Sequence, residues 1–141
     1  MAVTSEATTL WFGSLTEGKG TTSLDTSDAA EFPVTWAARS EGVAGTTTPE
    51  ELLGAAHSAC YSMALSHALT GAGHAPESLQ VTAAVTFQPG EGITGSHLLV
   101  NAKVPGITAE TFAEFAEDAK KNCPVSAALA GVSITLEATL A

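Results

Sequence analysis

The stretch Thr48-Pro-Glu-Glu-Leu-Leu-Gly-Ala-Ala-His-Ser-Ala-Cys-Tyr-Ser-Met-Ala-Leu-Ser66 decides how the chain folds. A threonine at the N-cap, a proline at the first helical position and Glu51 at the third mark a helix start. The pattern predicts a helix over residues 49–70, ended by Gly71 and kept from resuming by Pro76. Because this helix is apolar on nearly all sides and rich in small residues, other elements must cover it and approach it closely. We expect it to be the central helix of the molecule.

Strand patterns lie on both sides of this helix. The expected strands cover residues 8–24 as a hairpin, 32–36 as an edge strand containing Pro33, 79–88 and 93–104 as an antiparallel pair, and 132–140. The expected further helices cover residues 108–121, which are amphipathic, and 124–130. Strands segregated around a buried helix indicate an α+β fold.

The composition indicates one domain with a large apolar surface. Of the 141 residues, 45% are hydrophobic and 14% charged, which is enough for a hydrophobic core without disulfide bonds. We therefore expect a single domain over residues 1–141. A chain with so few charged residues must hide apolar surface, and a second copy is the simplest cover. We expect a homodimer.

The net charge of −10 argues against polyanionic partners. A field of this sign repels nucleic acid and anionic membranes, so neither is expected as a partner. The N-terminal residues lack the features of a signal peptide, and polar residues interrupt the apolar stretch 52–69. These features predict a cytoplasmic protein. In that reducing compartment, two lone cysteines are more often free or catalytic than a structural bridge.

The two cysteines and the single arginine are the candidate reactive residues. Cys60 lies about three turns into its helix, where the helix N-terminus gives little charge stabilisation, so a reactive thiolate there needs a nearby cation. Arg39 is the candidate, on or beside a glycine-containing loop, whereas His57 would have to be protonated to serve. Cys123 precedes Pro124 and is the expected N-cap of the short helix, a suitable position for a resolving thiol.

Less specific explanations remain for each of these residues. A cysteine in an alanine-rich helix is often only a small core residue, and a cysteine beside proline often has no role beyond the helix terminus. His57 and Cys60, with His67, could ligate a transition metal, but scattered ligands lack the clustering of a zinc site, and we expect no metal. Glu50 and Glu51 are explained as acids at the positive end of the helix.

The stretch from Thr48 to Ser66 resembles the signature of the OsmC/Ohr family of thiol-dependent peroxidases. Its Ala-Ala-His-Ser-Ala-Cys form is similar to the OsmC branch. Asn122-Cys-Pro-Val-Ser126 resembles the family's second cysteine motif, and Trp36-Ala-Ala-Arg-Ser-Glu-Gly42 lies where OsmC proteins carry an arginine. The likeness covers essentially the whole chain. It implies antiparallel sheets wrapped around long central helices, in an intertwined homodimer with two active sites at the subunit interface.

The resemblance also implies roles for four residues. Cys60 is the expected peroxidatic thiol, Cys123 the resolving thiol, Arg39 the activating cation and Glu50 the carboxylate partner of that arginine. In such a protein an organic hydroperoxide, favoured over hydrogen peroxide, oxidises the first thiol to a sulfenic acid, and the second thiol closes a disulfide. A dithiol donor then reopens the disulfide, with dihydrolipoyl groups favoured over glutaredoxin-type or small thiols. No metal, haem or flavin cofactor is expected.

The helix geometry adds one prediction about the site. In a continuous helix, Glu50 and Cys60 lie about 15 Å apart along the axis, at ~1.5 Å per residue. Glu50 is then too far away to orient an arginine at the Cys60 of its own chain, so we expect Arg39 and Glu50 to serve the partner subunit. Two other functions stay open. The chain could be a non-catalytic binding protein for small hydrophobic molecules, or Cys60 and Cys123 could form a static structural disulfide.

Overall fold

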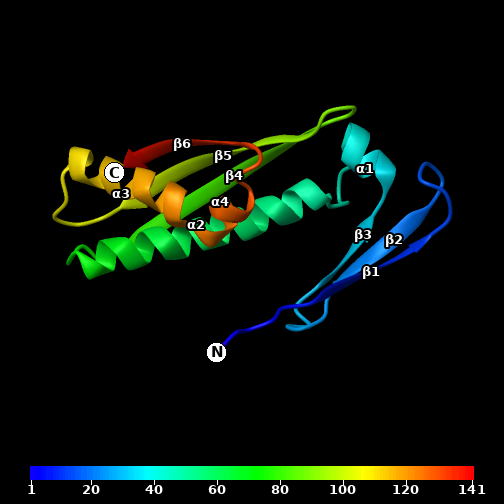
Figure 1. Ribbon diagram of the computed structural model, residues 1–141, viewed down its shortest axis with the longest axis horizontal. Helices are drawn as coiled ribbons and strands as arrows, with labels where there is room; N and C mark the ends of the chain where they lie inside the picture. The colour runs from blue at the N-terminus through cyan, green and yellow to red at the C-terminus, as the bar shows by residue number, and fades with distance from the viewer. The chain divides into compact units, whose positions relative to one another are not determined.

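The computed structural model describes all of residues 1–141 (Figure 1). The elements, in chain order, are β1 (Ala7–Phe12), β2 (Lys19–Leu24), β3 (Glu31–Val34), α1 (Trp36–Glu41), α2 (Pro49–Gly71), β4 (Ser78–Gln88), β5 (Gly92–Lys103), α3 (Ala109–Asn122), α4 (Pro124–Ala128) and β6 (Ser133–Leu140). They fall into two compact units, Met1–Pro49 and Glu50–Ala141. Each unit contains one three-stranded sheet and at least one helix, which confirms the predicted α+β class.

The first unit is an antiparallel sheet in the order β1-β2-β3, followed by α1. The predicted hairpin is confirmed as β1 and β2. Pro33 lies in the edge strand β3. A residue without an N–H is tolerated there, because an edge strand needs hydrogen bonds on one side only. Gly20 of β2 has no room for a side chain, because a Cβ there would lie 2.9 Å from both the Leu10 carbonyl oxygen and the Trp11 ring. Strand β1 is exposed along its whole length, including its apolar side chains.

Helix α1 corrects the sequence prediction around Arg39. The sequence predicts a strand through Trp36 followed by a loop, but β3 ends two residues earlier and both Trp36 and Arg39 lie in the helix. Thr35 begins this helix, since its hydroxyl accepts a hydrogen bond from the Ala38 N–H at 3.1 Å. Gly42, with a φ of 78°, ends it. These two caps are the sequence signals for a helix that is too short to show an apolar repeat.

The second unit is a sheet in the order β4-β5-β6 with helices on one face (Figure 1). Strands β4 and β5 are antiparallel, as predicted, whereas β6 pairs with β5 in parallel. The alternation predicted for the last strand is confirmed, but alternation is the same in either direction and therefore carried no information on the pairing. The buried positions of β5 also alternate, which directs one face toward the helices: Ser96, Leu98, Val100 and Ala102.

Helix α2 confirms the predicted long helix and continues for one further residue. Its buried side chains form a single stripe: Glu50, Gly54, His57, Tyr61, Leu65 and Leu69. Gly54 allows the close approach expected of the small residues, because a Cβ there would lie 2.7 Å from the Ala83 carbonyl oxygen of β4. The side of α2 that carries Met63 is exposed, so the chain alone does not cover this helix on most sides. None of the four helices combines the length with the hydropathy that a membrane span requires.

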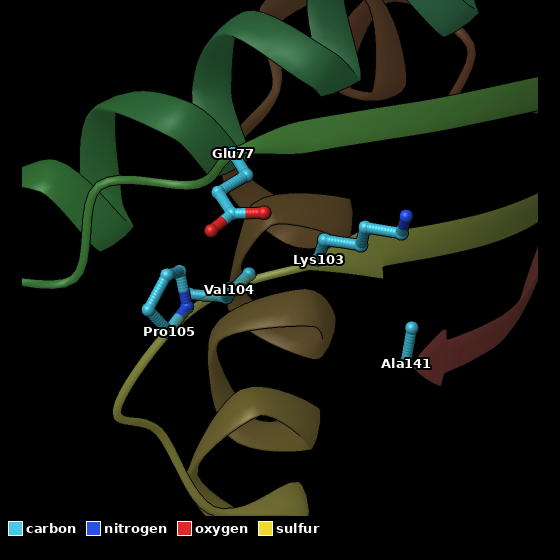
Figure 2. Close-up of a pocket in the computed structure, with 5 residues that line it drawn as sticks. All are labelled: Glu77, Lys103, Val104, Pro105 and Ala141. Atoms are coloured by element: carbon cyan, nitrogen blue, oxygen red, sulfur yellow. The ribbon is translucent and has the colours of Figure 1, made fainter.

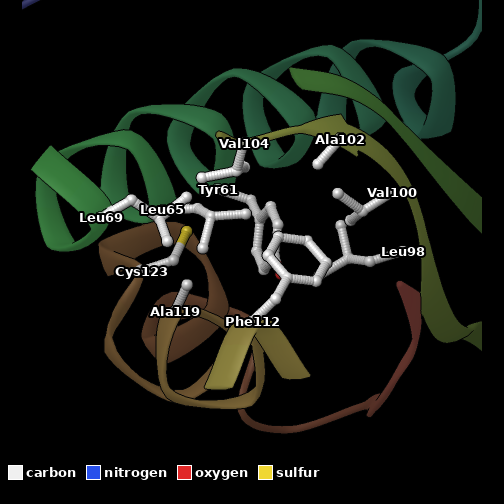
Figure 3. Packing of buried hydrophobic residues seen from close by; sticks show 10 residues of the cluster. All are labelled: Tyr61, Leu65, Leu69, Leu98, Val100, Ala102, Val104, Phe112, Ala119 and Cys123. Carbon is white, nitrogen blue, oxygen red and sulfur yellow. The ribbon is translucent and has the colours of Figure 1, made fainter. Parts of the chain in front are cut away.

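The core of the second unit lies between α2, the sheet and α3 (Figure 3). Helix α3 is amphipathic as predicted, begins at the N-cap Thr108 and buries Phe112, Ala116 and Ala119. The Tyr61 hydroxyl donates a hydrogen bond to the Ala116 carbonyl oxygen at 2.9 Å, which ties α2 to α3 through the core. Helix α4 follows directly after α3, so that residue 123 is shared as the cap of both. This junction directs one cysteine into the core.

Candidate active site

Two neighbouring elements bring the cysteine side chains together in the second unit. Cys60 lies in α2 and is half-buried. Cys123 lies where α3 ends and α4 begins, with its N–H donating to the Ala119 carbonyl oxygen at 2.9 Å and its carbonyl accepting from the Ala127 N–H at 3.0 Å. It is fully buried, and Figure 3 shows its sulfur in yellow near Leu65. The predicted N-cap position of Cys123 is confirmed, although its side chain does not cap the helix.

The two thiols are free and are hydrogen-bonded to each other. The Val125 N–H contacts both sulfurs, and the Ser126 N–H and hydroxyl both bond to the Cys123 sulfur. The structure therefore brings together the two cysteines that the sequence singled out. It also surrounds Cys123 with more hydrogen-bond donors than Cys60.

Burial and hydrogen bonding divide the negative charge unequally between the two thiols. Burial raises the pKa of the Cys60 thiol, the hydrogen bond shared with Cys123 raises it further, and the Val125 N–H opposes both effects. Burial also acts to raise the pKa of Cys123, but the hydrogen bonds from Cys60, Ser126 and Val125 outweigh it and lower that pKa. Within this unit, these hydrogen bonds therefore favour the thiolate on Cys123 over a thiolate on Cys60. A cation beside Cys60 is needed to reverse the order.

A buried histidine is connected to the thiol pair through a serine. His57 is fully buried, with Nδ1 2.7 Å from the Ser96 hydroxyl and Nε2 2.8 Å from the Ser126 hydroxyl. Burial lowers the pKa of His57, so the ring is neutral at pH 7. Both ring nitrogens are thus engaged by serines, neither of which sequence reasoning identified. The available signal was Ser96 itself, a polar residue in the inward row of β5, where a hydroxyl requires a buried partner.

The two other predicted site residues lie elsewhere in the chain. Arg39 is in α1 of the first unit, and Glu50 is in the first turn of α2 at the start of the second unit. Glu50 is buried and lies ten residues before Cys60 on the same unbroken helix. That continuity sets their separation at about 15 Å along the axis. Within the second unit, Cys60 is brought to Cys123 and not to Glu50.

The hollow drawn in Figure 2 is not the thiol site. It has a volume of about 320 Å³ and is lined by Glu77, Lys103, Val104, Pro105 and Ala141. A carboxylate and an ammonium group line it, but neither cysteine does. No three His, Cys, Asp or Glu side chains gather in a way that could hold a metal ion. The candidate active site is therefore the thiol pair.

Comparison with known sequences identifies the protein family. A family model described as OsmC-like protein matches residues 42–137, a range that contains both cysteines. The chain belongs to the OsmC-like family. Peroxiredoxin OsmC of Escherichia coli (strain K12) is 44% identical over 130 residues, which cover 90% of each chain, and Peroxiredoxin OsmC of Shigella flexneri matches equally well. The resemblance that the cysteine motifs indicated, including the OsmC branch, is confirmed.

Solved structures of related proteins have the same fold as this OsmC-like chain. The organic hydroperoxide resistance protein OhrB of Bacillus subtilis is 25% identical, with a TM-score of 0.71 over 97% of this chain and 98% of that one. An organic hydroperoxide resistance protein from Elizabethkingia anophelis is 27% identical, with a TM-score of 0.69 over 100% of this chain and 97% of that one. The predicted OsmC/Ohr-like fold is therefore confirmed.

Proposed function

We propose that this protein is a cysteine-based peroxidase that reduces organic hydroperoxides to alcohols. The observation that carries the proposal is the hydrogen-bonded pair of free thiols, one half-buried and one fully buried. Relatives named peroxiredoxin and organic hydroperoxide resistance protein support the same reaction class. The apolar residues Leu53 and Met63 lie on the helix of Cys60 and suit an alkyl group better than bulk water.

In the first step, the Cys60 thiolate attacks the distal oxygen of the hydroperoxide. The O–O bond breaks, the alkoxide takes up a proton and leaves as the alcohol, and Cys60 becomes a sulfenic acid. Because the hydrogen bonds of the second unit favour the thiolate on Cys123, this step needs a cation near Cys60. We assign that role to Arg39, the only arginine in the chain, which also stabilises the charge on the departing alkoxide. Glu50 is the proposed partner that orients the guanidinium.

In the second step, the Cys123 sulfur attacks the sulfur of the Cys60 sulfenic acid. The S–S bond forms, the S–O bond breaks, and the hydroxyl leaves as water with the proton of the Cys123 thiol. The existing contact between the two side chains supports rapid closure, before a second hydroperoxide can oxidise Cys60 further. A dithiol donor, for which dihydrolipoyl groups are the proposed source, then reduces the disulfide by exchange and ends as a disulfide itself.

The proposed active unit is a homodimer. Met63 on α2 is 72% exposed and Phe12 on β1 is 64% exposed, and apolar surface of this kind requires cover. A second copy of the chain is the cover that the resemblance implies. Because Glu50 lies about 15 Å from the Cys60 of its own helix, we propose that Arg39 and Glu50 complete the site of the partner subunit.

Thiol titration against a cumene-type hydroperoxide tests the proposed reaction. The reduced protein should release one alcohol for each pair of thiols that it loses. Cys60→Ser should abolish consumption of the hydroperoxide. Cys123→Ser should still consume it, but should stop at a sulfenic acid that a carbon nucleophile such as dimedone can trap. Consumption by Cys60→Ser at the parental rate would overturn the assignment of Cys60.

The two alternative functions give different results in the same titration. A non-catalytic binding protein for small hydrophobic molecules should keep both thiols in excess hydroperoxide. A static structural disulfide should lower the melting temperature when reduced, since a loop of this size contributes about 4 kcal/mol, and should give no activity in the reduced form. The free thiols of the structure favour the peroxidase over the static bond.

A further inference from the structure

A continuous series of buried hydrogen bonds runs from β5 to the thiol pair. The Ser96 hydroxyl contacts His57 Nδ1, His57 Nε2 contacts the Ser126 hydroxyl, and that hydroxyl contacts the Cys123 sulfur. All four side chains are buried, and no buried side-chain nitrogen or oxygen lacks a hydrogen-bond partner. No step of the proposed peroxidase reaction uses His57 or either serine. The series therefore needs a separate explanation.

The donor and acceptor roles of these groups give the series a direction. A thiolate only accepts hydrogen bonds, so the Ser126 hydroxyl donates to Cys123, and its oxygen is left to accept from His57 Nε2–H. A neutral imidazole has a single N–H, so Nδ1 accepts from the Ser96 hydroxyl. Burial keeps the ring neutral by lowering the pKa of His57. Every hydrogen bond in the series then points toward the Cys123 sulfur.

We propose that Ser126, His57 and Ser96 form a hydrogen-bond relay that stabilises Cys123 as the attacking thiolate in the disulfide-forming step. The inference rests on the proposed function, because the disulfide-forming step is part of that reaction. The relay neither gains nor loses a proton, because the hydroxide that leaves Cys60 takes up the proton that Cys123 released on ionising and departs as water. Ser126 touches the reacting sulfur, whereas His57 and Ser96 act through it and are positioning residues. Each bond polarises the next, so the serine is a stronger donor than an isolated hydroxyl.

Within the second unit, no cation is among the groups that shift the pKa of Cys123. Lys120 and Lys121 precede it in the last turn of α3, and the Lys120 ammonium pairs with the Glu117 carboxylate at 2.7 Å. Helix α2 presents Cys60 and Tyr61 to it, and Tyr61 is a neutral phenol whose pKa is raised by burial and then by the nearby charges of Glu117 and Cys123. Helix α4 adds the backbone N–H groups and the hydroxyl already described. The lowered pKa of Cys123 therefore comes from hydrogen bonds. Salt should screen these bonds much less than it screens an exposed ion pair.

Titration of a single thiol tests the relay without any hydroperoxide. Cys60→Ser leaves Cys123 as the only thiol, and its ionisation can be followed by the ultraviolet absorbance of the thiolate. Adding Ser126→Ala should lower the acid ionisation constant of Cys123 about tenfold, since a hydrogen bond to a charged group is lost. Ser96→Ala should shift it in the same direction by less, because the serine bonded to sulfur remains. Ser126→Thr keeps the hydroxyl and should restore the parental titration.

Ser58→Ala is the matched control for these substitutions. Its hydroxyl donates only to the Ala55 carbonyl oxygen of its own helix, at 3.2 Å, so its removal should leave the titration of Cys123 unchanged. Equal titration curves for Ser126→Ala, Ser96→Ala and the parental Cys60→Ser chain would overturn the relay. A change that Ser126→Thr does not restore would also overturn it, because the effect would then be one of packing.

Single-turnover kinetics in the chain with both cysteines separates the relay from the peroxidase reaction itself. With one equivalent of a cumene-type hydroperoxide per site, Ser126→Ala should slow disulfide formation about tenfold relative to hydroperoxide consumption. With excess hydroperoxide it should let Cys60 sulfinic acid accumulate, because a second hydroperoxide molecule then reaches the sulfenic acid. Slower consumption with normal disulfide formation would contradict the relay. If the unsubstituted protein consumes no hydroperoxide, the proposed function fails, whereas the single-thiol titration still decides whether the relay exists.

Discussion

At neutral pH the imidazole of His57 is an uncharged core group, and this makes the stability of the protein depend on pH. Because burial lowers its pKa below the ordinary value of 6.5, the unfolded chain takes up a proton at this residue before the folded chain does. The contribution of His57 to the free energy of unfolding is therefore complete above pH 6.5 and is lost as the pH falls toward the folded-state pKa. Urea unfolding at a series of pH values should show this decline.

Two substitutions isolate the contribution of this histidine. His57→Gln removes the titrating group and should flatten the decline, even if the substitution itself lowers stability at every pH. His67→Gln, on the exposed side of α2, is the matched control for the loss of an imidazole from this helix. Equal slopes for the parent and for His57→Gln would show that other groups cause the pH dependence.

Tyr61 gives a second prediction, because its buried hydroxyl has one well-defined partner. Tyr61→Phe keeps the ring and removes the hydrogen bond to the Ala116 carbonyl oxygen, so the free energy of unfolding should fall by about 1 kcal/mol. Tyr61→Ala also removes the ring from the core and should cost ~3–5 kcal/mol. Chemical denaturation of the three proteins measures both differences. A loss for Tyr61→Phe as large as that for Tyr61→Ala would contradict the separation of hydrogen bond from packing.

The chemistry of single residues was only partly predictable from the sequence. Cys60 and Cys123 were identifiable because each has a characteristic neighbourhood in the chain. The partners of His57 were not, because Ser96 lies 39 residues away and Ser126 lies 69 residues away. A histidine at i−3 from a cysteine suggests a local pair, but the buried stripe of α2 turns His57 toward β5 and α4 instead. Contacts that depend on tertiary packing leave no local pattern.

At the scale of elements, the approach of α2 to β4 is set by Gly54. A Cβ at this position would lie 2.7 Å from the Ala83 carbonyl oxygen, and a backbone atom cannot move aside as a flexible side chain can. Gly54→Ala should therefore lower the free energy of unfolding by ~1–3 kcal/mol. This loss should appear although alanine favours a helix interior over glycine by about 1 kcal/mol.

Gly71 in the same helix is the control for this substitution. A Cβ at Gly71 would meet no atom within 4 Å, so Gly71→Ala should be neutral or slightly stabilising in the same denaturation experiment. If Gly54→Ala proves as stable as Gly71→Ala, the contact with β4 does not limit the packing of α2.

Elements with a long sequence repeat were predictable from the sequence. Short elements were not, and neither was the parallel or antiparallel pairing of the last strand. Helix α2 has a clear start at Pro49, and β4 and β5 show alternation over many residues. Helix α1 has six residues, fewer than two turns, so only its caps at Thr35 and Gly42 distinguish it from a loop. The parallel pairing of β6 depends on how α3 and α4 cross from β5, which no pattern within β6 records.

At the scale of the whole molecule, two observations favour a site completed by a second subunit: the position of the negative charge on the thiol pair, and the distance between Glu50 and Cys60 along α2. Hydrogen bonds within the second unit favour the thiolate on Cys123, so an active Cys60 needs an added cation. Glu50, the proposed partner of that cation, lies about 15 Å along the helix from the Cys60 of its own chain. A second copy of the chain can supply both Arg39 and Glu50. The active species should therefore be a dimer. Analytical ultracentrifugation at the protein concentrations used in activity assays should detect it.

Mixed dimers decide whether Arg39 acts across the subunit interface. A dimer of one Cys60→Ser subunit and one Arg39→Ala subunit, purified by two different tags, contains one Cys60 and one Arg39 on opposite chains. If Arg39 serves the partner subunit, this dimer has one complete site and should reduce organic hydroperoxide at about half the parental rate, because one of two equivalent sites is intact. If Arg39 acts within its own chain, the dimer should be as inactive as either homodimer. The matched control is a dimer that carries both Cys60→Ser and Arg39→Ala on one subunit and neither on the other. This dimer should be inactive if Arg39 acts across the interface, and half-active if Arg39 acts within its own chain.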